Sequence, residues 1–86
     1  MASSRRNRVE LSSLVSYMAA NLVDQPEMVR VKQIDADGSV ILEVRVAPDD
    51  MGKVIGRHGR VARAMRTVVK AIAARQGKKA TVEIVE

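Results

Sequence analysis

The sequence contains no cysteine, no phenylalanine and no tryptophan, and its only aromatic residue is Tyr17. Without cysteine, the chain has no disulfide framework, no thiol nucleophile and no cysteine-ligated zinc or iron–sulfur site. Without a set of aromatic rings, it has no platform on which successive bases stack, as they do on RRM, OB-fold and cold-shock surfaces. Any nucleic-acid site in this chain must therefore bind by another route.

Long apolar runs are also missing. No stretch approaches the roughly 18 residues of a membrane-spanning helix, and no signal-peptide core follows the first residues. The length of 86 residues allows one compact domain and excludes a multidomain enzyme. Apolar residues make up 47% and charged residues 29%, which is the balance of a globular chain rather than a disordered one. We expect a soluble, cytoplasmic protein without a membrane partner, with a flexible basic tail at residues 1–8 and one domain at residues 9–86.

Positive charge is concentrated in one part of the chain. The net charge is +5, yet residues 1–50 carry six Lys and Arg against eight Asp and Glu. Residues 51–80 carry nine Lys and Arg and no acidic residue at all. Such a segment suits a polyanion such as nucleic acid, although a solvated surface alone would also account for the charge. A binding site therefore needs a shape as well as a charge.

Hydrophobic periodicity and turn signals predict six elements in the order αββααβ. The predicted helices span residues 9–23, 50–55 and 60–75, and the predicted strands span residues 27–34, 40–46 and 79–85. A tight turn at residues 35–38 joins the first two strands, because Gly38 adopts a positive φ at no steric cost. This pattern predicts an α+β domain.

Several side chains receive structural roles from the same pattern. Asp49 or Asp50 is expected to cap the short helix that follows it. Tyr17 is expected to pack beside the apolar stripe of the first helix, and the methionines to fill gaps in the core. The core side of the long helix is expected to consist of Val61, Met65, Val68 and Ile72. A basic stripe nearly opposite, most of which is expected to be a solvated face, consists of Arg60, Arg63, Arg66 and Lys70.

The segment Gly56-Arg57-His58-Gly59 is a very short connection between the two later helices. Glycines at both ends permit a sharp turn and leave no β-carbon in the way of a close approach. The next helix begins at once, so its free N–H groups and positive dipole end point into the same space. With Lys53, Arg57 and Arg60 around it, and His58 as a further donor, this loop predicts a shallow cradle for the phosphates of a nucleic-acid backbone.

A Gly-x-x-Gly tetrapeptide by itself is typical of an ordinary turn, but its place between two helices in an αββααβ chain is more specific. Val54-Ile55-Gly56-Arg57-His58-Gly59 resembles the Ile-Gly-x-x-Gly signature of the KH family. The element order is similar to the type II, prokaryotic KH fold. The run from Asp50 to Ala62, together with Gly77-Lys78-Lys79, resembles the small stand-alone bacterial KH proteins of the KhpA type.

The resemblance implies a three-stranded mixed sheet covered on one face by three helices. It also implies a non-catalytic module that holds about four unstacked nucleotides of single-stranded RNA. The backbone would lie on the Gly-x-x-Gly loop, and the bases would enter an aliphatic groove floored by the two later helices and the second strand. Val54 and Ile55 would lie at the edge of that groove, and Arg60 and Arg63 would extend the phosphate contacts.

The resemblance further implies an RNA chaperone or post-transcriptional regulator that pairs with itself or with a second KH-containing protein. Two alternatives stay open, a protein-interaction scaffold and a single-stranded DNA-binding domain. We expect no enzyme, because no pair of acids, nucleophile–base set or Walker-type loop is present. We also expect no metal, cofactor or small-molecule substrate, since His58 is the only histidine.

Overall fold

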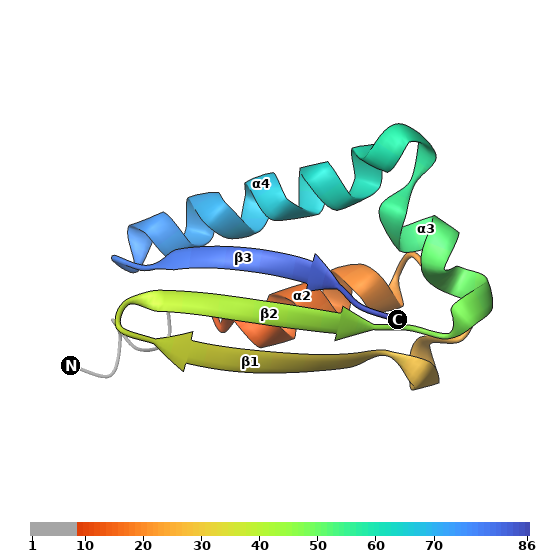
Figure 1. The fold of residues 1–86 in the computed structure, drawn as a ribbon, viewed down its shortest axis with the longest axis horizontal. Coiled ribbons are helices and arrows are strands. Elements are labelled where there is room, and N and C mark those ends of the chain that lie inside the picture. Colours follow the sequence, from red (N-terminus) through yellow and green to blue (C-terminus); the bar gives the residue numbers. More distant parts are fainter. Residues whose placement is uncertain (1–8) are drawn as a thin grey trace.

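The computed structural model describes residues 9–86, so the predicted basic tail at residues 1–8 lies outside the described residues. A three-stranded sheet forms one layer, and helices pack against one of its faces (Figure 1). The helices are α2 (Leu11–Ala20), α3 (Met51–Ile55) and α4 (Arg60–Arg75). The strands are β1 (Arg30–Ala36), β2 (Ser39–Arg45) and β3 (Lys79–Ile84). Short 3-10 turns occur at Pro26–Met28, Pro48–Asp50 and Arg57–Gly59.

The sheet has the order β1-β2-β3, with β2 in the centre. β1 pairs with β2 in an antiparallel register that opposes Gln33 and Leu42, and β2 pairs with β3 in parallel, opposing Leu42 and Val82. The parallel pairing needs a crossover, which α3 and α4 supply. The predicted α+β fold with a mixed sheet is therefore confirmed, and α3 and the loop after it lie where the end of β2 passes into α4 (Figure 1).

The β1–β2 hairpin turns on Asp37 and Gly38, whose φ angles are 38° and 81°. Two central residues with positive φ are the conformation that a two-residue hairpin favours, because it matches the twist of the strands. The predicted four-residue turn is thus too long, since β1 continues through Ala36. At its other end, the predicted strand start at residue 27 is replaced by the 3-10 turn at Pro26–Met28.

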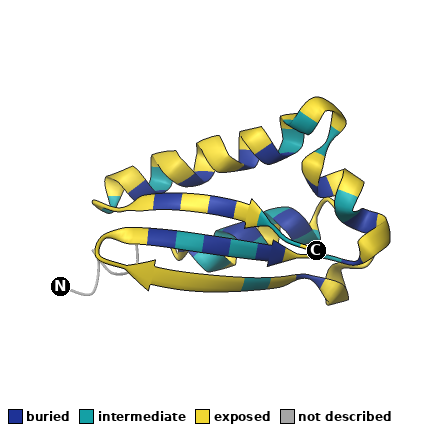
Figure 2. Ribbon diagram, viewed as in Figure 1, coloured by how far each residue is buried: buried dark blue, intermediate teal, exposed yellow. Residues whose placement is uncertain are grey.

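The core lies between the sheet and the helices. Alternate residues of β2 and β3 point into it, and β1 is exposed along nearly its whole length (Figure 2). The fully buried side chains include Leu42 and Val44 of β2, Val82 of β3 and Val15 of α2. The predicted alternation of β2 and β3 is confirmed.

The buried stripe of α4 differs from the predicted one. Met65 is buried as expected, but Val68 is 43% exposed. The other buried positions of α4 are Ala62, Val69 and Ala73. Small alanine side chains let this helix approach β3 closely, and that approach turns the valines of the predicted stripe toward α2.

Candidate nucleic-acid interface

The loop between α3 and α4 is shaped by Gly56. Its φ of 78° and ψ of 169° belong to a region of backbone space that is essentially restricted to glycine. A β-carbon at this position would also lie 2.8 Å from the backbone nitrogen of Val61, well inside contact distance. Glycine is therefore required at position 56 for two reasons. Only glycine readily adopts this backbone conformation, and a larger residue would clash with the start of α4.

The rest of the loop, Arg57–Gly59, is a tight turn in which His58 (φ 57°, ψ 25°) and Gly59 (φ 73°, ψ 15°) have left-handed rather than helical backbone angles. Arg57, His58 and Arg60 are all exposed, so the molecule's own side chains do not cover the loop. Within the described residues, the N–H groups of Arg57 and His58 form no backbone hydrogen bond. The loop thus presents main-chain donors and cationic side chains together at one exposed turn.

Arg63 stabilises this conformation. Its Nη2 donates a hydrogen bond of 3.1 Å to the carbonyl oxygen of His58. The bond spans the loop and the first turn of α4 and leaves the other guanidinium nitrogens free. Arg63 is therefore both a support for the loop and a cation next to it.

The two aliphatic residues predicted at the groove edge have different environments. Ile55 is 38% exposed beside the loop, whereas Val54 is fully buried in the core. The prediction that Val54 lies at the groove edge is corrected, because this side chain supports the loop from beneath. β2 is the central strand of the sheet, and β3, which packs against α4, is an edge strand.

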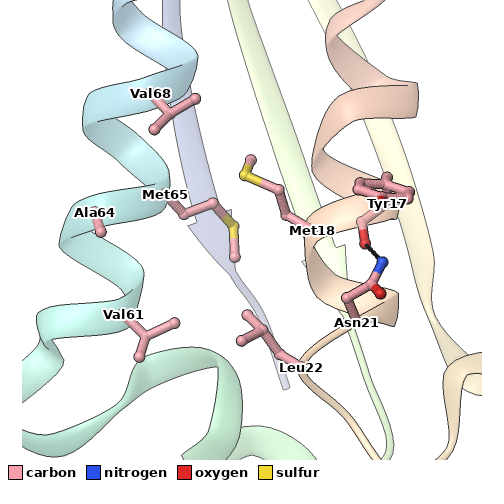
Figure 3. Close-up of a pocket in the computed structure, with 8 residues that line it drawn as sticks. All are labelled: Tyr17, Met18, Asn21, Leu22, Val61, Ala64, Met65 and Val68. Atoms are coloured by element: carbon pink, nitrogen blue, oxygen red, sulfur yellow. Dashed lines mark hydrogen bonds between the residues drawn. The ribbon is translucent and has the colours of Figure 1, made fainter.

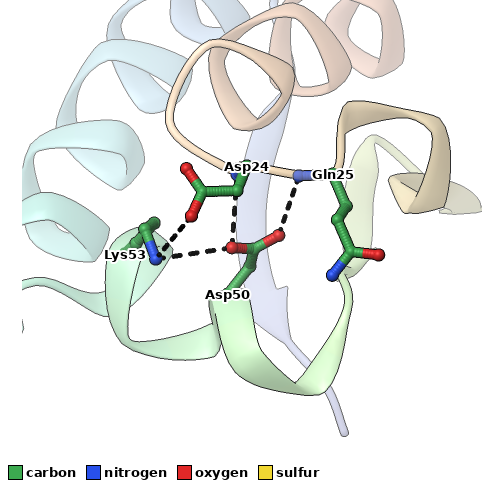
Figure 4. Close-up of polar contacts among 4 residues, drawn as sticks. All are labelled: Asp24, Gln25, Asp50 and Lys53. Atoms are coloured by element: carbon green, nitrogen blue, oxygen red, sulfur yellow. Dashed lines mark hydrogen bonds and ion pairs between the residues drawn. The ribbon is translucent and has the colours of Figure 1, made fainter.

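A polar cluster anchors α3, the helix that leads into the loop (Figure 4). The carboxylate of Asp50 accepts hydrogen bonds from the backbone N–H groups of Asp24 (3.2 Å) and Gln25 (3.1 Å). The ammonium of Lys53 lies 3.3 Å from a carboxylate oxygen of Asp24 and 3.5 Å from one of Asp50. The prediction that Asp50 caps the helix after it is therefore wrong. Its carboxylate instead binds the segment after α2, 26 residues earlier in the chain.

This cluster sets the charge states of its members. Burial alone would raise the pKa of Asp50, but the two backbone hydrogen bonds and the charge of Lys53 outweigh burial and hold the pKa below its usual value. The hydrogen bond and charge of Asp24 raise the pKa of Lys53. Lys53 is therefore held as a cation between two carboxylates, with its side chain 44% exposed.

The cluster predicts a pH-dependent stability. Because the folded-state pKa of Asp50 lies below its value in the unfolded chain, about 3.9, its contribution is complete above that value. It is lost as the pH falls through the lower folded-state pKa. The urea midpoint of Asp50→Asn should therefore lie below that of the unaltered protein at neutral pH, and the gap should narrow below about pH 4.

Asp49→Asn is the matched control for this experiment, since Asp49 is the exposed neighbour of Asp50. Its midpoint should follow that of the unaltered protein at every pH. A gap for Asp50→Asn that stays constant down to about pH 2 would show that the charge of this carboxylate does not stabilise the fold.

Comparison with known proteins gives this architecture a family. The family model described as "KhpA/KhpB, KH domain" matches residues 12–84 of the chain. The chain belongs to this family. The RNA-binding protein KhpA of Clostridium perfringens is 52% identical over 75 residues, which are 87% of this chain and all of that protein. The RNA-binding protein KhpA of Aquifex aeolicus is 45% identical over 76 residues, covering 88% of this chain and 96% of that one.

A solved structure has the same fold. The crystal structure of a variant of Era from Aquifex aeolicus superposes with a TM-score of 0.61 at 17% identity, covering 90% of this chain and 30% of that chain. At this identity the likeness concerns the fold alone. The resemblance to the KH family is confirmed, and because KhpA-type KH proteins are a non-enzymatic kind, so is the expectation that the chain is not an enzyme.

The KH domain carries two different surfaces on the two flanks of α4. At about 100° per residue, Arg63, Arg66 and Lys70 lie on the flank toward β3. The opposite flank lines an apolar groove of about 460 Å³ between α4 and α2 (Figure 3). Its lining consists of Tyr17, Met18, Asn21, Leu22, Val61, Ala64, Met65 and Val68. Among residues 9–86, those that line this groove include no charged one, in contrast to the basic flank.

Tyr17 belongs to this groove and not to the core. It is 69% exposed on the last turns of α2, which corrects the prediction that it packs beside the apolar stripe. Of the methionines predicted to fill the core, Met65 is buried, whereas Met28 is 47% exposed. Met18 of α2 and Met65 of α4 point toward one another in the groove, with Tyr17 on its α2 side and Val68 on its α4 side (Figure 3).

Two further observations concern groups outside these surfaces. Within residues 9–86, no three His, Cys, Asp or Glu residues are grouped as a metal site would require. In the same range, no helix has the length and apolar character needed to cross a membrane.

Proposed function

We propose that this KH domain binds single-stranded RNA and holds its phosphate backbone against the loop Gly56–Gly59. The observation that carries the proposal is the exposed loop itself, in which N–H groups without a backbone partner lie among exposed basic side chains. The relatives that cover the whole domain are named RNA-binding proteins, which supports RNA as the polyanion. The proposed backbone contacts are Gly56, Arg57, His58, Gly59 and Arg60, with Arg63 beside them.

Lys53 and the aliphatic residues have secondary parts in this proposal. The ammonium of Lys53 is already bound by Asp24 and Asp50, so it positions α3 and reaches a phosphate only if these ion pairs open. Ile55 offers an apolar contact to a base next to the loop, since it is 38% exposed. Val54 holds the loop from within the core.

A single KH domain contacts few nucleotides, so its binding is weak and reversible unless several copies act together. We therefore propose a role as an RNA chaperone or post-transcriptional regulator in the cytoplasm. Crosslinking the protein to RNA in cells and sequencing the bound RNA would test this role. Enrichment of many messenger or small RNAs would support it, and recovery no greater than from an uncrosslinked control would contradict it.

Direct titration tests the RNA-binding proposal itself. Short single-stranded RNA is expected to bind more tightly than DNA of the same sequence, and both affinities should fall as salt increases, because neutralised phosphates release counterions. With Z phosphates contacted, the slope of log K against log salt is about −0.7Z for single strands. Tighter binding of DNA would favour the single-stranded DNA alternative, equal affinities would contradict the expected preference for RNA, and no binding of either polymer would favour the protein-interaction scaffold.

The apolar groove between α2 and α4 supports a further proposal, self-association of the domain. Tyr17, Leu22 and Val68 are 69%, 37% and 43% exposed there, a cluster of apolar surface that a partner would cover. Because none of the described residues lining the groove is charged, two copies of this basic protein approach through it without repulsion between like charges in the groove. It also lies on the flank of α4 away from the basic one, so RNA and a second copy bind together.

Val68→Glu is expected to abolish self-association, because it places a charge on the α4 wall of the groove. Val68 is exposed in the isolated domain, so the fold should persist. Light scattering at several concentrations measures the change from dimer to monomer. Ala71→Glu is the control on the same helix, exposed but outside the groove lining. An unaltered protein that is monomeric at all concentrations would leave the groove to a different KH-containing partner and contradict self-association.

A further inference from the structure

The strand β1 forms the edge of the sheet on the side away from α4. It pairs with β2 on one side only, and it is exposed along nearly its whole length (Figure 2). Its seven residues pair with β2 in one continuous antiparallel register, without a bulge, and include no proline. Bulges and prolines are two devices that keep an open edge from accepting a further strand, and β1 has neither.

The free hydrogen-bonding groups of this edge belong to alternate residues. The carbonyl oxygen of Val44 accepts a hydrogen bond from the N–H of Val85, so the main chain of Val44 faces β3. Val31 is opposite Val44 in the antiparallel register and therefore directs its own N–H and C=O away from β2. The same alternation orients Gln33 and Asp35 in the same way. The edge thus offers a row of donors and acceptors at the spacing that another strand requires.

A groove lies beside this edge on the helix side of the sheet. Its volume is about 440 Å³, and its walls come from α2 and β1. The lining consists of Ser12, Ser13, Ser16, Tyr17, Ala20 and Val31. Small side chains on this flank of α2 leave room next to the edge, and the serine hydroxyls both donate and accept hydrogen bonds. A strand added to β1 directs every second side chain toward this groove.

The opposite, open face of the edge carries positive charge. Arg30 and Lys32 are exposed on this face, because the residue between them, Val31, points toward α2. Glu43 is opposite Lys32 on β2, but the ion pairs within residues 9–86 are those of Lys53 and do not involve Arg30 or Lys32. Cations on an edge disfavour pairing with an uncharged strand, yet they attract one that carries carboxylates.

From the open edge, the groove and the charge, we propose that β1 binds an extended segment of another protein, which adds to the sheet as an antiparallel strand. The segment carries acidic side chains next to Arg30 and Lys32 and small polar side chains, such as threonine, toward α2. A second copy of this chain fits less well, because its own α2 comes to the same face and meets a flank of serines instead of an apolar surface. The segment and RNA bind together, since α4 and the loop before it pack on the side of β3.

The probe for this site is the fluorescein-labelled peptide Ser-Thr-Val-Thr-Glu-Thr-Glu with an amidated C-terminus. In the antiparallel register its glutamates lie next to Lys32 and Arg30. Its threonines lie next to Val31, Gln33 and Asp35, and their N–H groups face β1. Fluorescence anisotropy is expected to show saturable binding. Amide exchange followed by NMR should slow about tenfold or more at these three residues of β1 when the peptide is added.

Two methylated peptides separate strand addition from attraction by charge alone. Methylation of the backbone nitrogens of the second and third threonines removes donors that face β1, and should weaken binding at least about tenfold. Methylation of the valine and the first glutamate changes nitrogens that face away from β1, and should weaken binding less than about twofold. The two peptides have the same charge and the same side chains.

A variant of the protein makes the same comparison from the other side. Gln33→Pro removes one N–H of the edge, and the pairing with β2 persists because this N–H faces away from β2. Its affinity for the peptide should fall at least about tenfold, with circular dichroism as the check of the fold. Gln33→Thr restores the N–H and should recover binding. If Gln33→Pro does not fold, the two methylated peptides decide the question.

Several results would overturn this inference. One is no binding up to about 1 mM peptide, and another is equal binding of the two methylated peptides. Displacement of the peptide by a short RNA would mean that the acidic probe binds the basic loop Gly56–Gly59 instead of the edge. Slow exchange of the edge amides in the concentrated free protein, lost on dilution, would assign the edge to a second copy. Each of these results leaves the proposed RNA binding intact.

Discussion

The double variant Arg57→Asp, His58→Asp is expected to keep its fold and to lose on the order of 10- to 100-fold in affinity for single-stranded RNA. Both side chains are exposed on the 3-10 turn, so neither contributes to the core. His58 has a positive φ, and aspartate is among the few residues other than glycine that tolerate it. The substitution replaces attraction to phosphates with repulsion at the centre of the proposed interface. Fluorescence anisotropy with a labelled oligomer measures the loss, and circular dichroism checks the fold.

The matched control is Lys78→Asp, Lys79→Asp, which changes the charge in the same direction at two exposed lysines beyond the other end of α4. If affinity depends on the loop, this control should weaken binding far less than the loop variant. Equal losses in the two variants would mean that only the overall charge attracts RNA, and the loop would then have no special part.

Gly56→Ala is expected to destabilise the domain by about 2–4 kcal/mol, because alanine in this backbone conformation is strained and its β-carbon meets the backbone of Val61. Small domains have little stability to lose, so part of the variant population should be unfolded at room temperature. Urea unfolding followed by circular dichroism gives the change in the free energy of unfolding.

Gly52→Ala is the matched control four residues earlier, inside α3. A β-carbon there meets no atom within 4 Å, and the φ of this glycine is ordinary. Alanine in a helix interior is better than glycine by roughly 0.5–1 kcal/mol, so this variant should be slightly more stable than the unaltered protein. A Gly56→Ala variant as stable as Gly52→Ala would show that the loop does not have the conformation described here.

Most of the fold was predictable because local signals agreed with it. The predicted bounds of α4 coincide with the observed helix Arg60–Arg75, since Gly59 and Gly77 flank it and the apolar period is clear. The alternation of Val40, Leu42 and Val44 identified the buried face of β2. The loop at residues 56–59 was identified from its two glycines and its place between helices. These features depend on residues close together in the chain.

The errors have a common origin in contacts between distant residues. Asp50 had the sequence position of a helix cap, but the backbone of Asp24 and Gln25 supplies its hydrogen-bond donors. Val68 had the spacing of a core residue, yet alanines on the neighbouring face bring α4 closer to β3 and turn this valine toward α2. Arg66 had the spacing of a solvated residue, but a strand edge lies within its reach.

The amino-acid order alone determined that this chain forms helices and strands in the KH order, with a glycine-bounded, basic turn after the short helix. It did so because periodicity, charge and backbone freedom are properties of neighbouring residues. Only the tertiary structure decided which flank of α4 faces which surface. The helix α4 packs on the edge strand β3 and beside α2, and the rotation of α4 about its axis depends on how closely it approaches each of them. This rotation places the basic flank on the side of β3 and the apolar groove on the side of α2.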